Sequence, residues 1–197
     1  MDPDAGAPAT REHVLRDGTR VVVRSLVPGD RDELSERYGQ LSAASRRLRF
    51  VSAPEHLSDR LLDHLLDVDH DQRFAIVAAL MDEPGVPGVG IARYVRRSDD
   101  PTIAEAAVTV LDEHQGRGIG TLLLTALVVA ALDNGIGAFV ADVMWENNEL
   151  LDRLRAVGAV VMPGEPGIAS VRVTLPTTPD ELVRSRVYQV MRTVGTA

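Results

Sequence analysis

QGRGIG, residues Gln115–Gly120, joins a strand-like apolar stretch to a long apolar run that extends from Thr121 to Leu132. Three glycines alternate with larger residues, so the backbone can turn tightly and come close to a ligand. The run that follows has the composition of a buried helix. Because the first amides of a helix lack intrahelical partners and carry partial positive charge, they attract phosphate. The segment therefore predicts a site for a phosphate-bearing molecule at the start of a helix.

The composition is that of a globular protein with one domain. The chain has 197 residues, of which 45% are apolar and 25% are charged. It contains no cysteine, which excludes disulfides and thiolate metal sites, and this fits a cytoplasmic location. A net charge of −8 argues against nucleic-acid binding, which requires a basic face. The longest apolar run, Ile119–Leu132, falls short of the roughly 20 residues that a membrane span needs.

Hydrophobic periodicity and turn residues predict a mixed α/β chain without internal repeats. The expected strands are 21–23, 74–80, 89–95, 103–111, 139–143, 160–162 and 170–175, and the expected helices are 30–40, 42–50, 57–66, 121–132, 147–157 and 178–192. Asp30 is a candidate helix cap, and Thr178 with Glu181 forms a candidate capping box. The last helix has an apolar face that can pack within the chain, which we expect, or form a homodimer. The order is early helices, an antiparallel meander and one strand–helix–strand crossover.

Three kinds of phosphate site compete for the glycine-rich loop. A Walker P-loop requires Gly-Lys-Ser/Thr, and this sequence has no lysine. A dinucleotide fingerprint requires GxGxxG after an early strand, whereas the spacing here is GxGxG behind a meander. The third kind is a coenzyme A site. Val108–Thr121 resembles the coenzyme A signature of the Gcn5-related N-acetyltransferase (GNAT) family, in which a strand, a Gln/Arg-Gly-x-Gly-x-Gly loop and a helix follow one another.

The resemblance extends from Val14 to Leu175 in the order of the predicted elements. It implies an α+β fold with a mixed, mostly antiparallel central sheet, flanked by helices and splayed where acetyl-CoA binds. We expect a disordered tail over residues 1–12, an N-acetyltransferase domain over 13–175 and a helical extension over 176–197. The residues that the resemblance assigns to the coenzyme are Val108, Thr109, Val110, Gln115, Gly116, Arg117, Gly118, Ile119, Gly120, Thr121, Asn147 and Leu150. For Asn147, the alternative is a helix cap.

Glu105 interrupts the apolar strand 103–107. At about 3.3 Å per residue it lies about 17 Å from Val110 along the strand, roughly the reach of an extended pantetheine arm. A carboxylate there could deprotonate an ammonium group, which cannot attack a thioester while protonated. The alternative is a solvated glutamate on a sheet face. The pattern Ala104-Glu105-Ala106-Ala107-Val108-Thr109-Val110 resembles bacterial protein lysine acetyltransferases, in which the glutamate is the catalytic base.

The expected activity is acetyl transfer from acetyl-CoA to a primary amine, with a protein lysine side chain as the best acceptor. The alternatives are a small amine, such as a polyamine, an aminoglycoside or an amino acid, and a non-catalytic coenzyme A–binding regulatory module. No metal is expected, because the acidic run Asp67–Asp71 lacks the pattern of an EF-hand. The sequence departs from many relatives at Leu154, where the resemblance would place a tyrosine that acts as general acid. His114 is expected to be a surface histidine.

Overall fold

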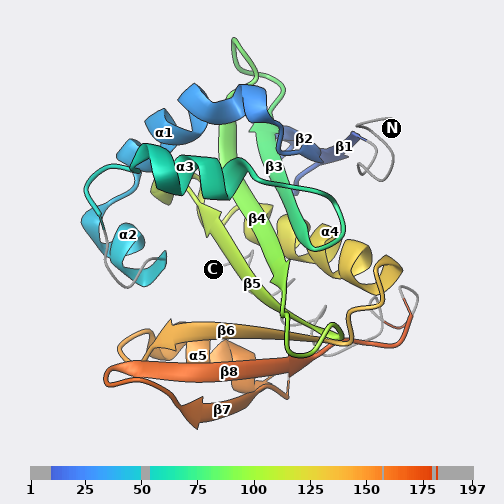
Figure 1. Ribbon diagram of the computed structural model, residues 1–197. Helices are drawn as coiled ribbons and strands as arrows, with labels where there is room; N and C mark the ends of the chain where they lie inside the picture. Colours follow the sequence, from blue (N-terminus) through green and yellow to red (C-terminus); the bar gives the residue numbers. More distant parts are fainter. Residues whose placement is uncertain (1–9, 50–53, 157, 179–180, 182–197) are drawn as a thin grey trace.

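The computed structural model describes residues 10–49, 54–156, 158–178 and 181. Eight strands form one sheet in the order β1-β2-β3-β4-β5-β6-β8-β7, with every neighbouring pair antiparallel except β5 and β6 (Figure 1). The strands are β1 (Arg11–Val14), β2 (Arg20–Ser25), β3 (Arg73–Leu80), β4 (Gly88–Arg96), β5 (Ile103–Val110), β6 (Ala138–Met144), β7 (Val160–Pro163) and β8 (Ile168–Thr174). The helices are α1 (Arg31–Gln40), α2 (Ala43–Arg49), α3 (Asp59–Leu66), α4 (Ile119–Asp133) and α5 (Asn148–Ala156), with short 3-10 turns η1 (Pro28–Asp30) and η2 (Asp112–His114).

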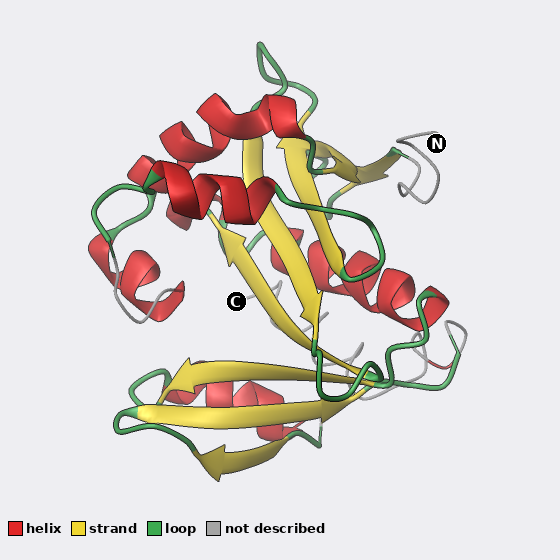
Figure 2. Ribbon diagram, in the orientation of Figure 1, coloured by secondary structure: helices red, strands yellow, loops and turns green. Residues whose placement is uncertain are grey.

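Helices cover both faces of the sheet, as Figure 2 shows. Helix α4 packs against β3, β4 and β5 on one face, and its side chains at Ile119, Leu123 and Leu127 are fully buried. These residues recur every four positions, so they form the face of the apolar helix that packs on the sheet. Helices α1 and α3 lie on the other face and contact each other. Helix α3 contributes Leu62 and Leu65 to the core, and α1 contributes Tyr38.

The sheet opens between β5 and β6 (Figure 1). These parallel strands are in register only at Ile103–Ala138, Ala104–Phe139 and Glu105–Val140. Beyond Glu105, β5 continues for five residues along β4, while β6 continues along β8. The backbone groups of β5 beyond Glu105 therefore have an edge that β6 does not cover. The predicted mixed sheet and its splay are confirmed.

The predicted strands and helices correspond to elements of the structure, with shifts of a few residues at their ends. Strand β1 begins at Arg11, two residues inside the tail that we expected to be disordered, because residues 11–14 pair with β2. Asp30 is the N-cap residue of α1, as predicted, but its side chain makes no capping hydrogen bond. Its carboxylate instead receives two hydrogen bonds from Arg24, at 2.7 and 2.8 Å, and one from the Val27 amide.

The predicted C-terminal helix, with its proposed dimer face, falls mostly outside the described residues. At its start, the Glu181 amide donates to Thr178 Oγ1, as the capping box requires. The Glu181 carboxylate accepts from the Thr177 amide and hydroxyl at 3.0 and 2.6 Å. In a capping box this carboxylate would accept from the amide of Thr178, so the second hydrogen bond of the box is displaced by one residue, to Thr177.

Candidate functional site

The glycine-rich loop connects η2 to α4 and turns through two left-handed residues. Gly116 has φ 73° and Gly118, the N-cap of α4, has φ 93°. Side-chain-bearing residues rarely adopt these values, so glycine is required at both positions. Gln115 fixes the start of the loop, since its Nε2 donates to the Val110 carbonyl oxygen at 3.1 Å. The loop is thus held directly beside the end of β5.

The loop presents a row of amides without backbone partners. The first backbone hydrogen bond of α4 runs from the Leu122 amide to the Gly118 carbonyl oxygen. Among the described residues, the amides of Gly116–Gly120 donate to no backbone or side-chain acceptor. They lie at the positive end of a 15-residue helix whose first turn has no acidic residue. Such a cluster of donors is suited to a pyrophosphate group.

The Arg117 side chain is engaged within the protein, where it holds the loop to the turn between β1 and β2. Its Nε donates to Asp17 Oδ2 at 2.8 Å, and its Nη2 donates to Thr19 Oγ1. Hydrogen bonds from the Thr19 backbone and side chain, and then from Arg117, hold the pKa of Asp17 at about 2. Asp17 is therefore ionised at neutral pH. We therefore expect the backbone amide of Arg117 to contact the ligand and its guanidinium to position the loop.

Replacing either partner of this ion pair tests that role. We expect Arg117→Met and Asp17→Asn each to weaken coenzyme A binding about three- to tenfold, because each releases the loop from the β1–β2 turn. The double variant should be no weaker than either single variant. Isothermal titration calorimetry with coenzyme A measures all three. If Asp17→Asn instead tightened binding, the guanidinium would be a phosphate ligand that Asp17 restrains.

Strand β5 directs alternate amides toward the open edge. The Leu111 amide donates to the Val89 carbonyl oxygen of the neighbouring chain segment, so the amides of Thr109 and Ala107 also face β4. By the same alternation, the amides of Val108 and Val110 face the splay. These are two of the three strand positions that the resemblance to the GNAT family assigned to the coenzyme. Thr109 is not at this edge: its amide faces β4, and its side chain lines a cavity beneath α1.

Glu105 occupies the last position at which β5 and β6 are in register, where the splay begins. Its side chain is exposed, on the same face of the sheet as Ala107 and Thr109. The strand spacing puts it about 17 Å from Val110. The amide row thus lies beside one end of the uncovered stretch of β5, and the exposed carboxylate of Glu105 lies at the other end.

The opposite wall of the splay is formed by β6 and the start of α5. Asn147 caps α5, since its Oδ1 accepts from the Leu150 amide at 3.3 Å. Asn147 also lines an open cleft of about 610 Å³ between α2 and α5, which the Arg47–Glu146 ion pair spans. Leu150 is 38% exposed. Leu154, in contrast, packs into the small apolar cluster of β6, α5 and β8 and offers no proton.

Comparison with known proteins agrees with this geometry. Residues 40–157 match the model of the acetyltransferase (GNAT) family. The chain belongs to this family. It is 33% identical to an acetyltransferase of Pseudomonas aeruginosa over 146 residues, which are 74% of this chain and 78% of that protein. It is 32% identical to acetyltransferase Pat of Mycolicibacterium smegmatis over 190 residues, 92% of this chain and 56% of that protein.

Solved structures give the same result for this acetyltransferase. The GNAT domain of S. lividans PAT superposes with a TM-score of 0.75 at 28% identity, covering 85% of this chain and 99% of that chain. A cAMP-binding acyltransferase from Mycobacterium smegmatis superposes with a TM-score of 0.60 at 27% identity, covering 96% of this chain. This chain spans only 57% of that acyltransferase. The likeness therefore concerns a little more than half of that protein.

The enzyme class defines the reactants in general terms. Members of the family use acetyl-CoA as donor and an amine as acceptor. In the part of the chain that the structure describes, no helix is long and apolar enough to cross a membrane. The described residues also contain no group of three or more acidic or histidine side chains suited to a metal ion. The acidic run Asp67–Asp71 is paired with arginines, through Arg73 and Arg96.

Sequence reasoning was wrong about His114 and overlooked Arg93. The His114 side chain is only 13% exposed, because it packs beside Arg117, whose Nη1 lies 3.2 Å from His114 Nδ1. Arg93 stands in the middle of β4, between apolar residues, and is 6% exposed. Burial lowers the pKa of Arg93 from its ordinary value, and the charge of Glu105 opposes that change. A charged residue in an otherwise apolar strand was the signal that could have found it.

Proposed function

We propose that the enzyme transfers the acetyl group of acetyl-CoA to the side-chain amine of a protein lysine. The observation that carries the proposal is the row of unpartnered amides from Gly116 to Gly120, aligned with the uncovered edge of β5 and with Glu105. The pyrophosphate would lie on the amides, and the pantetheine arm would extend β5 through the amides of Val108 and Val110. The arm would then end beside Glu105.

In this arrangement each group has a separate chemical task. Glu105 accepts a proton from the lysine ammonium, directly or through one water molecule, so that the neutral amine can attack the thioester carbon. A β5 amide at the open edge donates to the thioester oxygen as negative charge develops there. The thiolate leaves without a protein acid at Leu154, because a thiol ionises near pH 8.5 and is a good leaving group. Holding both reactants supplies much of the rate.

A lysine acceptor is supported by two features beyond the resemblance of the sequence pattern. One is the 32% identity with acetyltransferase Pat over 92% of this chain. The other is the open cleft between α2 and α5, whose lining has two carboxylates, Glu146 and Glu149, against one arginine, Arg47, which pairs with Glu146. The remaining negative charge would attract a cationic lysine as it approached the splay. The net charge of −8 acts in the same direction.

An acceptor panel tests the choice of amine. Thiol release from acetyl-CoA is measured with lysine-containing proteins, polyamines, aminoglycosides and free amino acids, and the products are mapped by mass spectrometry. We expect kcat/KM for the best protein acceptor to exceed that for every small amine by at least about tenfold, which corresponds to about 1.4 kcal/mol. A preference for a small amine would replace protein lysine with that compound. Coenzyme binding without thiol release from any acceptor would favour the non-catalytic module.

A further inference from the structure

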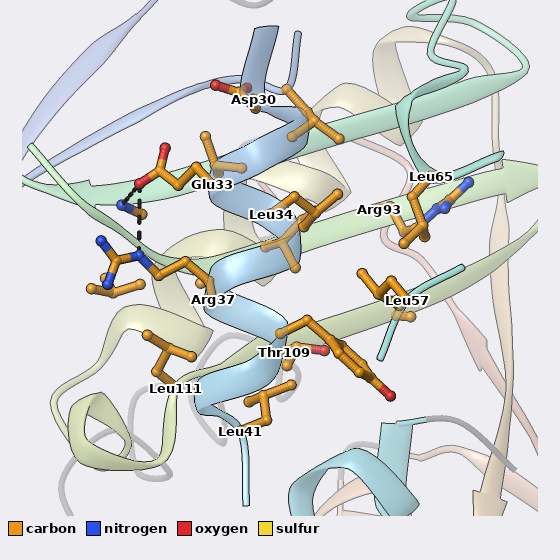
Figure 3. Close-up of a pocket in the computed structure, with 18 of the residues that line it drawn as sticks. Asp30, Glu33, Leu34, Arg37, Leu41, Leu57, Leu65, Arg93, Thr109 and Leu111 are labelled. Carbon is orange, nitrogen blue, oxygen red and sulfur yellow. Dashed lines mark hydrogen bonds and ion pairs between the residues drawn. The ribbon is translucent and has the colours of Figure 1, made fainter. Parts of the chain in front are cut away.

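A cavity lies between helices α1 and α3 and the sheet, on the face that carries Glu105. It has a volume of about 90 Å³ and is lined by residues of α1, α3, β3, β4 and β5 (Figure 3). Most of its wall is apolar, including Leu34, Leu57, Leu65 and Ile91. One water molecule needs about 10–15 Å³ of such space, so the cavity has room for about six groups of the size of a water molecule. It is large enough for a short chain of atoms.

The cavity contains a buried cation that has no direct hydrogen-bonded partner, although the charges of Glu105 and Asp67 favour it from a distance. Arg93 lines it and is 6% exposed, yet its guanidinium has no hydrogen bond and no ion pair within 4.0 Å among the described residues. The other two arginines of the wall are engaged: Arg24 is bonded to Asp30 at 2.7 Å, and Arg37 to Gln40 at 3.1 Å. A buried charge without a partner is costly, so the site favours an anion.

A second unpaired polar group faces the same space. Thr109 Oγ1 is buried and has no hydrogen-bond partner, and Thr109 lines the cavity from β5. A hydroxyl donates readily to a carboxylate oxygen. The guanidinium of Arg93 presents several donors in a plane, which suits the two oxygens of a carboxylate. An apolar wall with these two donors is suited to a short aliphatic chain that ends in a carboxylate.

The cavity adjoins the position proposed for the acyl group. Arg93 on β4 is the cross-strand partner of Ala107 on β5, and Ala107 also lines the cavity. Glu105, the proposed base, precedes Ala107 by two residues on β5 and lies on the same face. An acyl chain longer than acetyl that turned from the edge of β5 onto this face would extend toward Ala107 and Arg93.

We propose that the cavity receives the distal part of a dicarboxylic acyl group, as in succinyl-CoA, with Arg93 as counter-ion of its terminal carboxylate. This inference rests on the proposed function, because it takes the acyl end of the coenzyme to lie beside Glu105. The succinyl group exceeds acetyl by four non-hydrogen atoms, which the cavity can hold. The reaction is unchanged in kind: the amine nitrogen bonds to the acyl carbon, the carbon–sulfur bond breaks, its electron pair leaves with the thiolate, and Glu105 takes the ammonium proton.

Three acyl donors test the proposal with the wild-type protein and the best acceptor. Acetyl-CoA, succinyl-CoA and butyryl-CoA are compared, since butyryl has the chain length of succinyl without its carboxylate. We expect kcat/KM for succinyl-CoA to exceed that for butyryl-CoA about tenfold or more, as a charge-assisted hydrogen bond provides. A preference for butyryl-CoA over succinyl-CoA would overturn the assignment of a carboxylate. This comparison needs no variant.

Variants locate the effect at Arg93. We expect Arg93→Met to lower kcat/KM for succinyl-CoA about 10- to 100-fold and to change that for acetyl-CoA less than about threefold. Arg93→Lys should recover part of the loss. The matched control Arg20→Met removes one positive charge from the exposed first residue of strand β2 and should leave the ratio of kcat/KM for the two donors unchanged. Equal losses with both donors in Arg93→Met would show a structural role and contradict the proposal.

Binding without turnover separates this inference from the proposed function. Isothermal titration calorimetry compares succinyl-CoA with coenzyme A in wild type and Arg93→Met. We expect succinyl-CoA to bind wild type more tightly than coenzyme A does, and the difference to vanish in Arg93→Met. Equal affinities in wild type would contradict the carboxylate site even if acetyl transfer were active. If no acetyl transfer occurred but succinyl-CoA still bound wild type more tightly than coenzyme A did, the proposed function would fail and the carboxylate site would stand.

Discussion

Glu105→Gln is expected to lower kcat for acetyl transfer by about 10²- to 10⁴-fold, the range that general-base catalysis contributes. The amide has nearly the shape of the carboxylate but cannot accept the proton of an attacking ammonium group. Glu105 is exposed at the end of the β5–β6 register and makes no hydrogen bond or close ion pair among the described residues, so the substitution breaks no direct contact and removes only its longer-range effect on Arg93. The affinity for coenzyme A should change less than about threefold, since the proposed pyrophosphate and pantetheine contacts use other backbone groups. Steady-state kinetics and calorimetry measure the two quantities.

The matched control for this substitution is Glu83→Gln. Glu83 is an exposed glutamate in the turn between β3 and β4, and its replacement removes the same charge away from the splay. We expect its kcat to equal that of wild type. Full activity of Glu105→Gln at neutral pH would exclude Glu105 as the base, and a water or another group would have to accept the proton.

Gly120→Ala is expected to weaken coenzyme A binding about tenfold or more without destabilising the protein. A Cβ at Gly120 would have one neighbour within 4 Å, Val110 Cγ2 at 3.7 Å, which is an ordinary contact. The methyl group would therefore be accommodated in the apoprotein, and alanine favours a helix over glycine by up to about 1 kcal/mol. It would point toward the end of β5, where the coenzyme must pass between strand and loop. The stability of Gly120→Ala should thus rise slightly while its affinity for coenzyme A falls.

Gly39→Ala is the matched control for Gly120→Ala. Gly39 lies in α1, and a Cβ there would meet no atom within 4 Å. Gly39→Ala should raise the melting temperature by about as much as Gly120→Ala does, and it should leave the affinity for coenzyme A unchanged. Thermal unfolding and calorimetry on both variants give the comparison. Unaltered affinity in Gly120→Ala would show that the coenzyme does not approach this glycine, and the location of the phosphate site would have to be revised.

The local features of the site could be predicted from the sequence because each depends on neighbouring residues. Glycines at 116 and 118 fit a loop with positive φ, and the apolar run after Ile119 fits a buried helix. The alternation of β5 could be extended to Val108 and Val110 once the strand was recognised. The resemblance to the GNAT family supplied the splay, which no local pattern indicates.

Features that depend on distant partners could not be predicted. Arg117 is held by Asp17, which is 100 residues away in the chain. The orientation of Thr109 follows from the register of β5 against β4, and a shift of one residue would exchange its face with that of Val108. The unpaired state of Arg93 follows from the packing of α1 and α3 over the sheet. Each of these required the tertiary structure.

A single-turnover experiment tests the account most directly. The enzyme is mixed with acetyl-CoA labelled in the acetyl carbons and with a lysine-containing protein acceptor, and the products are identified by mass spectrometry. We predict labelled acetyl on the lysine Nε, in an amount equal to the thiol released, with wild type, and about 100-fold slower formation with Glu105→Gln. Bound acetyl-CoA that transfers no label from wild type to any acceptor, or equal rates in the two proteins, would contradict the account.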